Sequence, residues 1–408
     1  MKILHITAQK PDSTGSGVYM SGLIQCLDKL GHKQAVITGI DIKDNKNSFK
    51  ENIRHYPMIY NSGKLNFSVI GMSDNMPYES TKYKDLTPDM VKIIKEEFLN
   101  TLKRAVKEFK PEVIVCNHLY LITSFVREAI KDIKIIGICH GTCLRQLKNI
   151  DLEKDYIISN INNLDYILTL HENQRKDIID MFNIKGDKVE VIGSGYDDKI
   201  FYNKNYTKGK TINITYAGKL CKSKGLKSLL QSLDKVKYSP KDIIINFAGS
   251  GSDKSDVNEI KYLAEKSKYK VEFHGRLNHD ELSDLFNKSD IFILPSFYEG
   301  LPIVVLEALA CGVKVIVSEI EGLKEFIGDE INSSGNISYL NLPPMKSAGV
   351  PFENKLFEFE DNMAKTLEKS IINIKNKSEN KNISLKNKTW DGLAKKVEII
   401  LENIILKF

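Results

Sequence analysis

Short apolar runs alternate along this chain of 408 residues with longer segments in which apolar side chains recur at helical spacing. Near-continuous apolar strands separated by amphipathic helices are typical of parallel sheets that are covered on both faces. Two such series follow one another, which predicts two doubly wound α/β domains rather than a single barrel. The predicted strands are 2–8, 34–40, 113–117, 135–141, 165–171 and 188–194 in the first series, and 212–218, 243–249, 269–275, 290–296 and 314–319 in the second.

A glycine-containing segment, IGSGYDDKIF at 192–201, separates the two series. Its glycines, Gly193 and Gly195, mark a turn, and we predict an interdomain hinge there. The N-terminal domain is then expected to span residues 1–193, and the C-terminal domain residues 194–389.

Regular periodicity is lost in two places of the second half. Residues 328–361 are rich in Pro, Ser and Asn, and we interpret them as a long surface loop. Residues 373–388 are mostly polar, and we interpret them as a mobile excursion. Apolar periodicity returns at Trp390 and predicts an amphipathic helix over 390–408.

The composition is that of a globular protein, with 42% hydrophobic and 27% charged residues and a net charge of +6. This mild excess suits a phosphorylated ligand or an anionic surface, but it also fits a sequence rich in Lys and Asn, and it does not indicate a nucleic-acid partner. No apolar run approaches the roughly 18–20 residues that a membrane-spanning helix needs. The opening MKILHITAQKP becomes polar too early for a signal peptide and is predicted to be a strand.

The six cysteines are scattered and show no disulfide framework. Cys139 and Cys143 are four residues apart, but no second pair of ligands stands nearby to complete a zinc site. We therefore expect a reducing environment, either the cytoplasm or the inner face of its membrane, where peripheral contact stays open.

Ligands of doubly wound sheets bind at the carboxyl ends of the strands, so residues that follow the predicted strands are the candidates for a site. After the first strand, Gly15 and Gly17 precede a helix expected to begin near Val18, whose free N–H groups favour an anion such as phosphate. Glycine-rich loops often only turn the chain, however. This one lacks both the Gly-Lys-Ser/Thr of a Walker loop and the third glycine of a dinucleotide fingerprint.

The turn after the first strand of the second series is a stronger candidate. Lys219 and Lys224 flank this turn and Gly225 opens the next helix, so two ammonium groups can reach one diphosphate. A merely solvated basic turn is the alternative, because Lys222 and Lys227 lie in the same stretch.

Two further strands of the second series end in glycine. Gly249 and Gly251 follow the strand IIINFAG in the same strand-then-glycine arrangement. The strand YKVEFHG ends at Gly275 and is followed by Arg276 and Leu277, whose backbone could lie along a flat base.

Two glutamates stand eight residues apart in SFYEGLPIVVLEALACG, residues 296–312. Glu299 precedes Gly-Leu-Pro, whereas Glu307 is the only polar side chain between Ile303 and Cys311. A buried carboxylate without partners costs several kcal/mol or becomes neutral. Glu307 therefore needs a hydrogen-bond partner, either in a ligand or in a neighbouring loop.

In their order, these pieces resemble a retaining glycosyltransferase of family 4, with the GT-B fold, over essentially the whole chain. Glu299 and Glu307 match the family's Glu-x7-Glu motif, and ICHG matches its histidine at a strand end, here His140. GKLCKSKG matches Gly-Arg-Leu-x-x-x-Lys-Gly, but Lys219 replaces the usual arginine, which keeps the charge and loses the bidentate fork. VIGSGYD stands where the family usually has Val-Ile-Pro-Asn-Gly-Val-Asp, so the hinge is recognisable but atypical.

The resemblance implies two Rossmann-like domains that face each other across a cleft. The N-terminal domain 1–193, completed by the return helix 390–408, would be the acceptor side. The C-terminal domain 194–389 would bind the nucleotide sugar. The acceptor itself, a glycan, lipid, protein or small molecule, is not identified by the loop sequences of the first domain.

For the donor, the resemblance implies that Glu307 accepts hydrogen bonds from ribose hydroxyls. Glu299 would hold hydroxyls of the transferred sugar together with the amides of Gly300, Leu301 and Ile303. The remaining donor-binding residues would be Gly15, Gly17, Lys219, Lys224, Gly249, Arg276 and Leu277. A UDP-linked sugar is expected because uridine is the family's commonest base.

For the reaction, the resemblance implies transfer of a hexosyl or N-acetylhexosaminyl group with retention and without a covalent glycosyl-enzyme. The departing phosphate oxygen would serve as base, and His140 and Glu299 would be the catalytic residues. Asn117 and His118, which end the strand VIVCN, are candidates for contact with the acceptor. Two lysines and two helix N-termini can stabilise the leaving diphosphate, so we expect no metal and no cofactor.

Two alternatives from other classes stay open. A GT-B-like sugar-nucleotide epimerase would need acid and base carboxylates in the first half, where none clearly follows a strand. A catalytically idle partner subunit would fit the departures at Lys219 and at the hinge, but it would tend to have lost Glu299, His140 or Lys224, which are all present.

Overall fold

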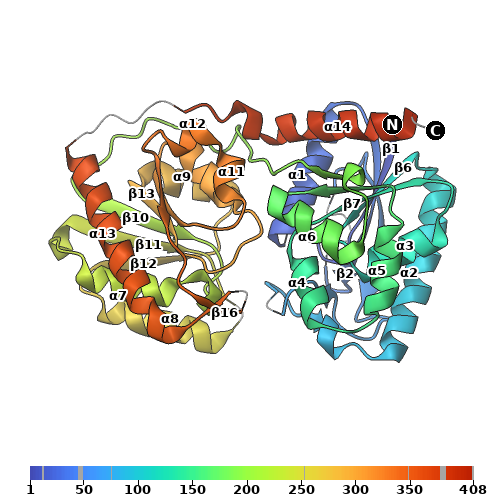
Figure 1. Ribbon diagram of the computed structural model, residues 1–408, viewed down its shortest axis with the longest axis horizontal. Helices are drawn as coiled ribbons and strands as arrows, with labels where there is room; N and C mark the ends of the chain where they lie inside the picture. The colour runs from blue at the N-terminus through green and yellow to red at the C-terminus, as the bar shows by residue number, and fades with distance from the viewer. Residues whose placement is uncertain are drawn as a thin grey trace. The chain divides into compact units, whose positions relative to one another are not determined.

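The computed structural model of this chain describes residues 1–11, 13–44, 49–74, 76–251, 253–347, 349–376 and 383–406. The chain forms two compact units, unit 1 with Met1–Gly195 and Trp390–Phe408, and unit 2 with Tyr196–Thr389. Each unit has a parallel sheet with helices packed on it (Figure 1). The prediction of two doubly wound α/β domains is therefore confirmed. The division after Gly195 falls inside the predicted hinge segment 192–201.

Unit 1 is built on a seven-stranded sheet in the order β3-β2-β1-β6-β7-β8-β9, in which all neighbouring strands are parallel. The central strands are buried along almost their whole length, because helices cover both faces. A separate pair of short strands, β4 (Ile70–Gly71) and β5 (Thr81–Lys82), lies outside this sheet. The strands of the sheet are β1 (Lys2–Ile6), β2 (Lys33–Asp41), β3 (Arg54–Tyr60), β6 (Val113–Asn117), β7 (Lys134–Ile138), β8 (Tyr166–Thr169) and β9 (Val189–Val191).

The direction in which strands are added reverses in unit 1 between β1 and β6. Because crossovers between parallel strands are right-handed, helices before and after this reversal cover opposite faces. Accordingly α1 packs against α14, whereas α3 packs against both α2 and α5 (Figure 1). The α-helices described in this unit are α1 (Gly15–Lys29), α2 (Pro88–Phe109), α3 (Leu121–Ala129), α4 (Thr142–Asn149), α5 (Lys154–Asn162), α6 (Glu172–Phe182) and α14 (Trp390–Leu406).

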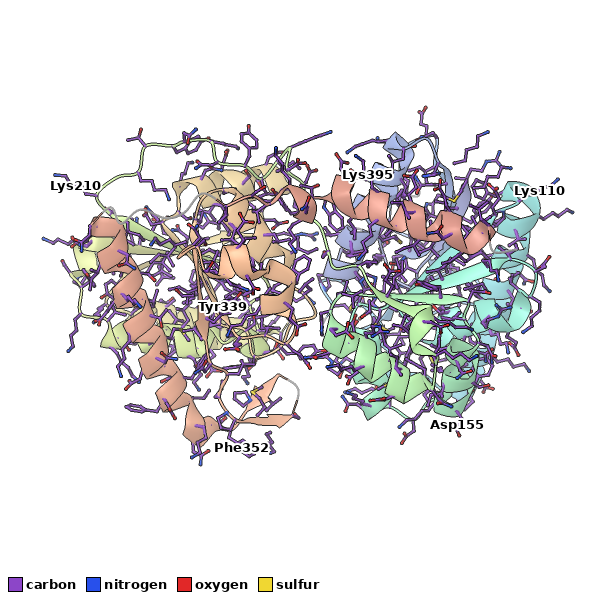
Figure 2. The ribbon with its side chains drawn as sticks, turned by 45° about the horizontal axis from the view of Figure 1, so that its top comes forward. Lys110, Asp155, Lys210, Tyr339, Phe352 and Lys395 are labelled. Carbon is purple, nitrogen blue, oxygen red and sulfur yellow. The ribbon has the colours of Figure 1, made fainter. Side chains whose placement is uncertain are left out.

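Helix α14 joins the end of the chain to unit 1. Its first residue, Trp390, lies against Gly22 of α1, where a Cβ atom would come within 2.7 Å of the indole carbon Cε2. Glycine at this position therefore lets the two helices approach closely. Lys395, labelled in Figure 2, lies on the exposed face of α14. The last two residues of the predicted helix, 407 and 408, lie outside the described residues.

Unit 2 is built on a six-stranded parallel sheet in the order β12-β11-β10-β13-β14-β15. Helices α7, α8 and α13 pack side by side on it, as Figure 1 shows. The strands are β10 (Ile212–Ala217), β11 (Ile243–Ala248), β12 (Lys270–Gly275), β13 (Ile291–Leu294), β14 (Lys314–Ser318) and β15 (Ile337–Leu340). The α-helices described are α7 (Leu226–Lys235), α8 (Lys254–Lys266), α9 (His279–Lys288), α10 (Ile303–Ala310), α11 (Leu323–Ile327), α12 (Asp329–Asn332) and α13 (Leu356–Lys375).

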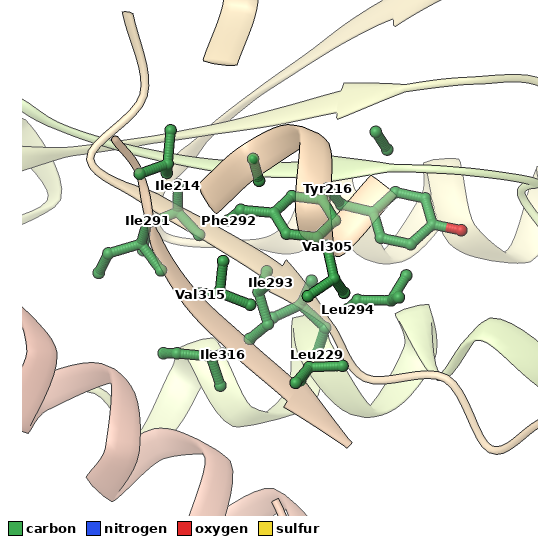
Figure 3. Close-up of a cluster of buried hydrophobic side chains, with 14 of the residues drawn as sticks. Ile214, Tyr216, Leu229, Ile291, Phe292, Ile293, Leu294, Val305, Val315 and Ile316 are labelled. Atoms are coloured by element: carbon green, nitrogen blue, oxygen red, sulfur yellow. The ribbon is translucent and has the colours of Figure 1, made fainter. Parts of the chain in front are cut away.

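The core of unit 2 centres on β13 and on α10, which follows it (Figure 3). Ile291 and Ile293 of β13 are fully buried, and Val305 of α10 packs into the same cluster. Helix α10 is apolar around nearly its whole circumference, which is the pattern of a helix enclosed by protein. Any polar side chain on α10 is thus placed in or beside a core.

The interpretation of residues 328–361 as a long surface loop is wrong. This stretch contains α12, the edge strand β15, a hairpin of β16 (Met345–Ser347) and β17 (Val350–Pro351), and the start of α13. Tyr339 of β15 and Phe352 after the hairpin are labelled in Figure 2. These elements are too short to show a period, and β15 forms because β14 supplies its hydrogen-bonding partner.

Two further differences concern strand β3 and the predicted excursion 373–388. Strand β3 is not among the predicted strands; it contains Pro57, which is tolerated because β3 is an edge strand. Of the predicted excursion 373–388, α13 includes the first residues and a 3-10 turn forms at Lys386–Lys388, while 377–382 lie outside the described residues. No helix in the described ranges combines the length and the apolar character needed to cross a membrane.

Candidate functional site

The loops after β10 and β13 meet at the point in unit 2 where the strand order reverses, which is where ligands of such sheets bind. The N–H of Phe297 donates to the carbonyl of Ser223 at 2.8 Å, which ties the two loops together. Gly225 has φ +67, and a Cβ there would lie 2.1 Å from the carbonyl oxygen of Pro295. Gly225, the last glycine of the GKLCKSKG motif, is thus required by close backbone packing as well as by its dihedral angle.

This contact brings Lys224 and Glu299 together. Lys224 ends the 3-10 turn η3 (Lys222–Lys224), and its Nζ lies 2.5 Å from Glu299 Oε1. Both side chains are largely buried, with exposed fractions of 16% and 18%. Ser296 Oγ donates to the same carboxylate oxygen at 2.8 Å. The sequence did not single out Ser296, although its place three residues before Glu299 could have indicated it.

The other basic residues of this turn differ from Lys224 in their surroundings. Lys222 lies on the surface and pairs with Asp256 at 3.4 Å, and Lys227 pairs with Glu259 at 3.0 Å. These two lysines therefore fit the alternative interpretation, in which basic residues of the turn are merely solvated. Lys219 is half-buried, and its carbonyl oxygen accepts a hydrogen bond from the Tyr216 hydroxyl at 2.6 Å.

Glycines hold the loops after β10, β11 and β12 against one another. Gly218 donates to the Ala248 carbonyl, and Gly249 donates to the Gly275 carbonyl. Gly249 has φ +138, and a Cβ there would lie 1.8 Å from the carbonyl oxygen of Gly218. A Cβ on Gly251 would likewise lie 2.2 Å from the Leu220 carbonyl oxygen. Backbone packing alone accounts for these glycines, so their presence does not by itself indicate a ligand.

Glu307 lies on α10, is 8% exposed, and has no side-chain hydrogen bond or ion pair within the described part of the chain. Burial, with a smaller contribution from the charge of Asp197, raises the pKa of Glu307 to about 8. The carboxyl group is therefore mostly neutral at pH 7. Among the described residues Glu307 caps no loop, so its carboxyl group is available to a ligand.

The start of α10 adds unpaired backbone donors. The helix begins at Ile303, and Pro302 is its N-cap. Pro302 therefore lies one residue before the first turn of the helix. Among the described residues, no acceptor is found for the N–H groups of Gly300 and Leu301. Leu301 and Ile303 also pack their side chains against the core of the unit.

The structure places Arg276 and Leu277 directly after β12. Arg276 is exposed, and Leu277 packs against the edge of the core. Gly275 has φ +68, which turns the chain at this point.

In unit 1, polar side chains gather at the carboxyl ends of β6 and β7. Asn117 ends β6, and its Oδ1 lies 3.0 Å from Nε2 of His140, which follows β7. A carbonyl oxygen can only accept, so Nε2 of His140 carries the proton in this contact and Nδ1 keeps its lone pair. The rings of Tyr19 and His118 lie edge-on to His140, with centroid distances of 5.1 and 4.9 Å.

Burial keeps His140 neutral. It lowers the pKa of His140 well below the usual value, and the charge of a protonated His118 would lower it further. His118 itself has φ +73, in the left-handed region that non-glycine residues seldom occupy. Its Nε2 lies 3.1 Å from the hydroxyl of Ser16 in the loop after β1. The structure thus brings His118, His140 and Asn117 together, which their separate positions in the sequence did not show.

The loop at Gly15 and Gly17 differs from its prediction. Helix α1 begins at Gly15 rather than near Val18, and Thr14 is its N-cap. The Thr14 hydroxyl accepts the N–H of Gly17 at 3.2 Å, so this donor is already used. Gly15 is exposed, and no atom lies within 4 Å of the place of its Cβ. Among the described residues of this loop, the N–H of Gly17 is thus occupied, whereas Gly15 lies exposed.

Several residues around these candidates were not found from the sequence, because they come close to the candidates only in the folded chain. Gln9 accepts hydrogen bonds from the hydroxyls of Thr14 and Ser16, which organises the loop after β1. Tyr19 donates to the carbonyl of Gly193 and also lies beside His140. In the described ranges, no group of three or more His, Cys, Asp or Glu side chains is arranged to hold a metal ion.

Two family models match most of this chain. A family described as Glycosyltransferase Family 4 matches residues 80–199, and one described as Glycosyl transferases group 1 matches residues 197–338. An uncharacterised glycosyltransferase of Methanocaldococcus jannaschii is 30% identical over 180 residues, which are 41% of this chain and 45% of that protein. The chain thus matches less than half the length of this curated relative.

Solved structures show the same fold over the whole chain. Sucrose-phosphate synthase from Thermosynechococcus elongatus superimposes with a TM-score of 0.70 at 16% identity, covering 100% of both chains. An Anabaena protein, Alr3699/HepE, in complex with UDP and glucose superimposes with a TM-score of 0.69 at 12% identity, covering 98% of this chain and 99% of its own. At these identities the likeness concerns the fold.

Proposed function

The chain belongs to the group 1 and family 4 glycosyltransferases, with their GT-B fold, and from this premise we propose that it transfers a sugar from a nucleotide donor to an acceptor hydroxyl with retention of configuration. In this proposal unit 2 binds the nucleotide sugar and unit 1 is the acceptor side. The transferred group is a hexosyl or N-acetylhexosaminyl residue.

The observation that carries the proposal is the unpartnered carboxyl group of Glu307. A buried carboxyl without a hydrogen bond costs stability unless a ligand supplies the missing partner. Two vicinal hydroxyls, such as those of a ribose, would each donate to one oxygen of an ionised carboxylate. We infer that Glu307 binds the ribose of the nucleotide, and that binding shifts this carboxyl from its neutral to its ionised form.

The Lys224–Glu299 pair would open when the donor binds. In the free protein each charge satisfies the other at 2.5 Å, so neither is buried alone. A diphosphate would attract Lys224, and the hydroxyls of the transferred sugar would donate to Glu299. Lys219 and the free N–H groups of Gly300 and Leu301 would add to the stabilisation of the leaving diphosphate.

His140 would position the transferred sugar as a neutral imidazole. Asn117 fixes the ring through its contact with Nε2, so that Nδ1 can accept a hydrogen bond from a sugar hydroxyl. Asn117 and His118 would thus act partly through His140 and partly toward the acceptor. The departing phosphate oxygen takes the proton of the acceptor hydroxyl, so no protein nucleophile is needed.

The donor is inferred to be a UDP-sugar. The Anabaena structure of the same fold holds UDP and glucose, and uridine is the family's commonest base. A panel of UDP-, GDP- and ADP-sugars, scored for thermal stabilisation and slow hydrolysis, tests this choice. Inversion at C2 of the recovered sugar would instead indicate an epimerase, and binding without any hydrolysis or transfer would indicate an idle subunit.

The central experiment separates the two glutamates. Glu307→Gln keeps the size of the side chain and removes its charge, so UDP affinity should fall about ten- to a hundredfold, as expected for a charged hydrogen bond. Glu299→Gln should leave UDP affinity nearly intact and lower kcat, because the sugar changes most in the transition state. Calorimetric titration with UDP and turnover on the best donor measure these effects. Equal loss of UDP binding in both variants, at an unchanged melting temperature, would refute the assignment.

A further inference from the structure

Two buried thiols flank the residue His140. Cys139 comes directly before it and Cys143 lies three residues after it, and their sulfur atoms are 3.5 Å apart. Both side chains are fully buried, and both cysteines are in the free thiol form. Neither thiol has a part in the proposed transfer reaction. The proposed transfer reaction therefore does not explain why two thiols lie so close together on either side of a candidate catalytic residue.

The local backbone holds the two sulfurs on the same side of a tight turn. Cys139 is anchored at the end of β7, where its N–H donates to the Leu168 carbonyl at 2.9 Å. Gly141 then reverses the chain with φ +82, and Cys143 lies in the first turn of α4. A disulfide between the two sulfurs would close a ring over His140, Gly141 and Thr142, the segment CHGTC.

The surroundings of the two thiols favour ionisation of Cys143 over ionisation of Cys139. Burial raises the pKa of Cys139. Burial also acts against the charged form of Cys143, but its contacts with Cys139 and His118 outweigh burial and hold the pKa of Cys143 well below its usual value. A position in the first turn of a helix adds to this effect. Cys143 is therefore the attacking thiolate and Cys139 the second thiol.

We propose that Cys139 and Cys143 form a reversible disulfide, and that this modification site controls the loop that carries His140. The oxidant is a small-molecule disulfide. The Cys143 thiolate attacks one of its sulfurs, which releases a first thiolate and forms a mixed disulfide. Cys139 loses its proton and attacks the Cys143 sulfur, which releases the second thiolate. Two electrons and two protons leave the pair, and the small-molecule disulfide becomes two thiols.

Oxidation would change the geometry around His140. The sulfurs must approach from 3.5 Å to about 2.0 Å, which draws the end of β7 and the first turn of α4 together. The contact of His140 with Asn117 at 3.0 Å depends on the backbone between the two cysteines. This effect on the reaction rests on the proposed function, whereas the formation of the disulfide does not.

The disulfide is tested on the full chain in buffers with graded ratios of oxidised to reduced glutathione. After acid quenching and alkylation, the tryptic peptide 135–145 contains both cysteines and reports their state by mass. We expect both thiols of this peptide to disappear together, with a loss of two hydrogen masses, and to return on reduction. Cys143→Ser should abolish this change, whereas Cys26→Ser, which removes another buried thiol, should leave it intact.

A peptide that keeps both free thiols at the most oxidising ratio overturns the site, as does loss of the two thiols one at a time. In the oxidised protein, turnover should fall at least about tenfold and recover on reduction, and Cys139→Ser should remove this sensitivity. A disulfide that leaves turnover unchanged overturns the control of His140. If the reduced protein shows no turnover with any donor, the proposed function fails, and the thiol measurement still decides the disulfide.

Discussion

The carboxyl edges of the two sheets hold their polar side chains in different states. In unit 1 these side chains are hydrogen-bonded, as in the contacts of His140 with Asn117 and of His118 with Ser16, and burial keeps His140 neutral. In unit 2 an ion pair between Lys224 and Glu299 stands at the same edge. Uncharged hydrogen-bonding groups can orient a ligand, whereas a buried cation adds its charge to the backbone N–H groups that stabilise a leaving diphosphate. In the proposed function, charge stabilisation would fall to unit 2 and positioning to unit 1.

The glycine loops of the two units also differ in how closely they pack against neighbouring backbone. In unit 1 Gly15 has open space where a Cβ would be, whereas in unit 2 Gly249 and Gly225 lie directly against neighbouring carbonyl oxygens. Unit 2 thus needs close backbone packing to bring its loops, and with them its charges, together. In unit 1 the polar cluster is formed by side chains at the ends of neighbouring strands.

The largest expected effect tests whether charge in unit 2 drives the reaction. Lys224→Met should lower kcat/KM about 10²–10³-fold, because it removes a buried charge aimed at the diphosphate. Lys222→Met is the matched control: it changes an exposed lysine of the same turn and should alter kcat/KM less than about threefold. Steady-state kinetics on both variants, with melting curves to check folding, measure the difference. Similar losses in both would mean that the turn contributes only general positive charge.

A second prediction concerns the packing of the glycine loops. Gly249→Ala should lower the free energy of unfolding of unit 2 by about 3 kcal/mol or more, because its Cβ would collide with the Gly218 carbonyl at an unfavourable φ. Gly15→Ala should change stability by less than about 0.5 kcal/mol, since nothing lies near its Cβ. Urea denaturation measures both. A Gly249→Ala variant as stable as the wild type would contradict the packing explanation and leave ligand contact as the reason for this glycine.

A third prediction uses the pKa of Glu307. In the free protein this pKa is raised from 4.5 to about 8, so the folded protein holds a proton at pH 7 that nucleotide hydroxyls must displace. Affinity for UDP should therefore rise with pH, by up to about tenfold per unit between about pH 6.5 and 8, and level off above. Glu307→Gln should lose this slope. Calorimetry at several pH values decides it, and an identical slope in the variant would show that another group titrates.

The smallest expected effect is that of removing divalent metal ions, which should leave transfer unchanged. If Lys219, Lys224 and helix N-termini stabilise the diphosphate, transfer should persist in excess EDTA. Turnover measured with and without EDTA, and after adding Mg²⁺ or Mn²⁺, provides the check. Complete loss that a divalent metal restores would move charge stabilisation away from the lysines of unit 2.

Sequence alone was enough for the fold class and for the main candidates. Buried parallel strands leave near-continuous apolar runs, so β1, β6, β10 and β13 could be located from local composition. Glu307 was recognisable because a single carboxylate in the apolar stretch of α10 violates the usual pattern of a buried helix. Such signals are readable because they depend on neighbours in the chain.

Tertiary structure decided whatever depends on contacts between distant segments. β15 has too few residues to show a period and forms because β14 pairs with it. Lys222 and Lys224 lie two residues apart in one turn, yet of the two Lys224 meets Glu299, because Gly225 lets the η3 turn pack against Pro295. Asn117 and His140, 23 residues apart, become hydrogen-bonded because β6 and β7 are neighbours in the sheet. Hydropathy reports whether a side chain is buried, but the partner it meets there is set by the order of the strands and by the backbone contacts that fix their loops.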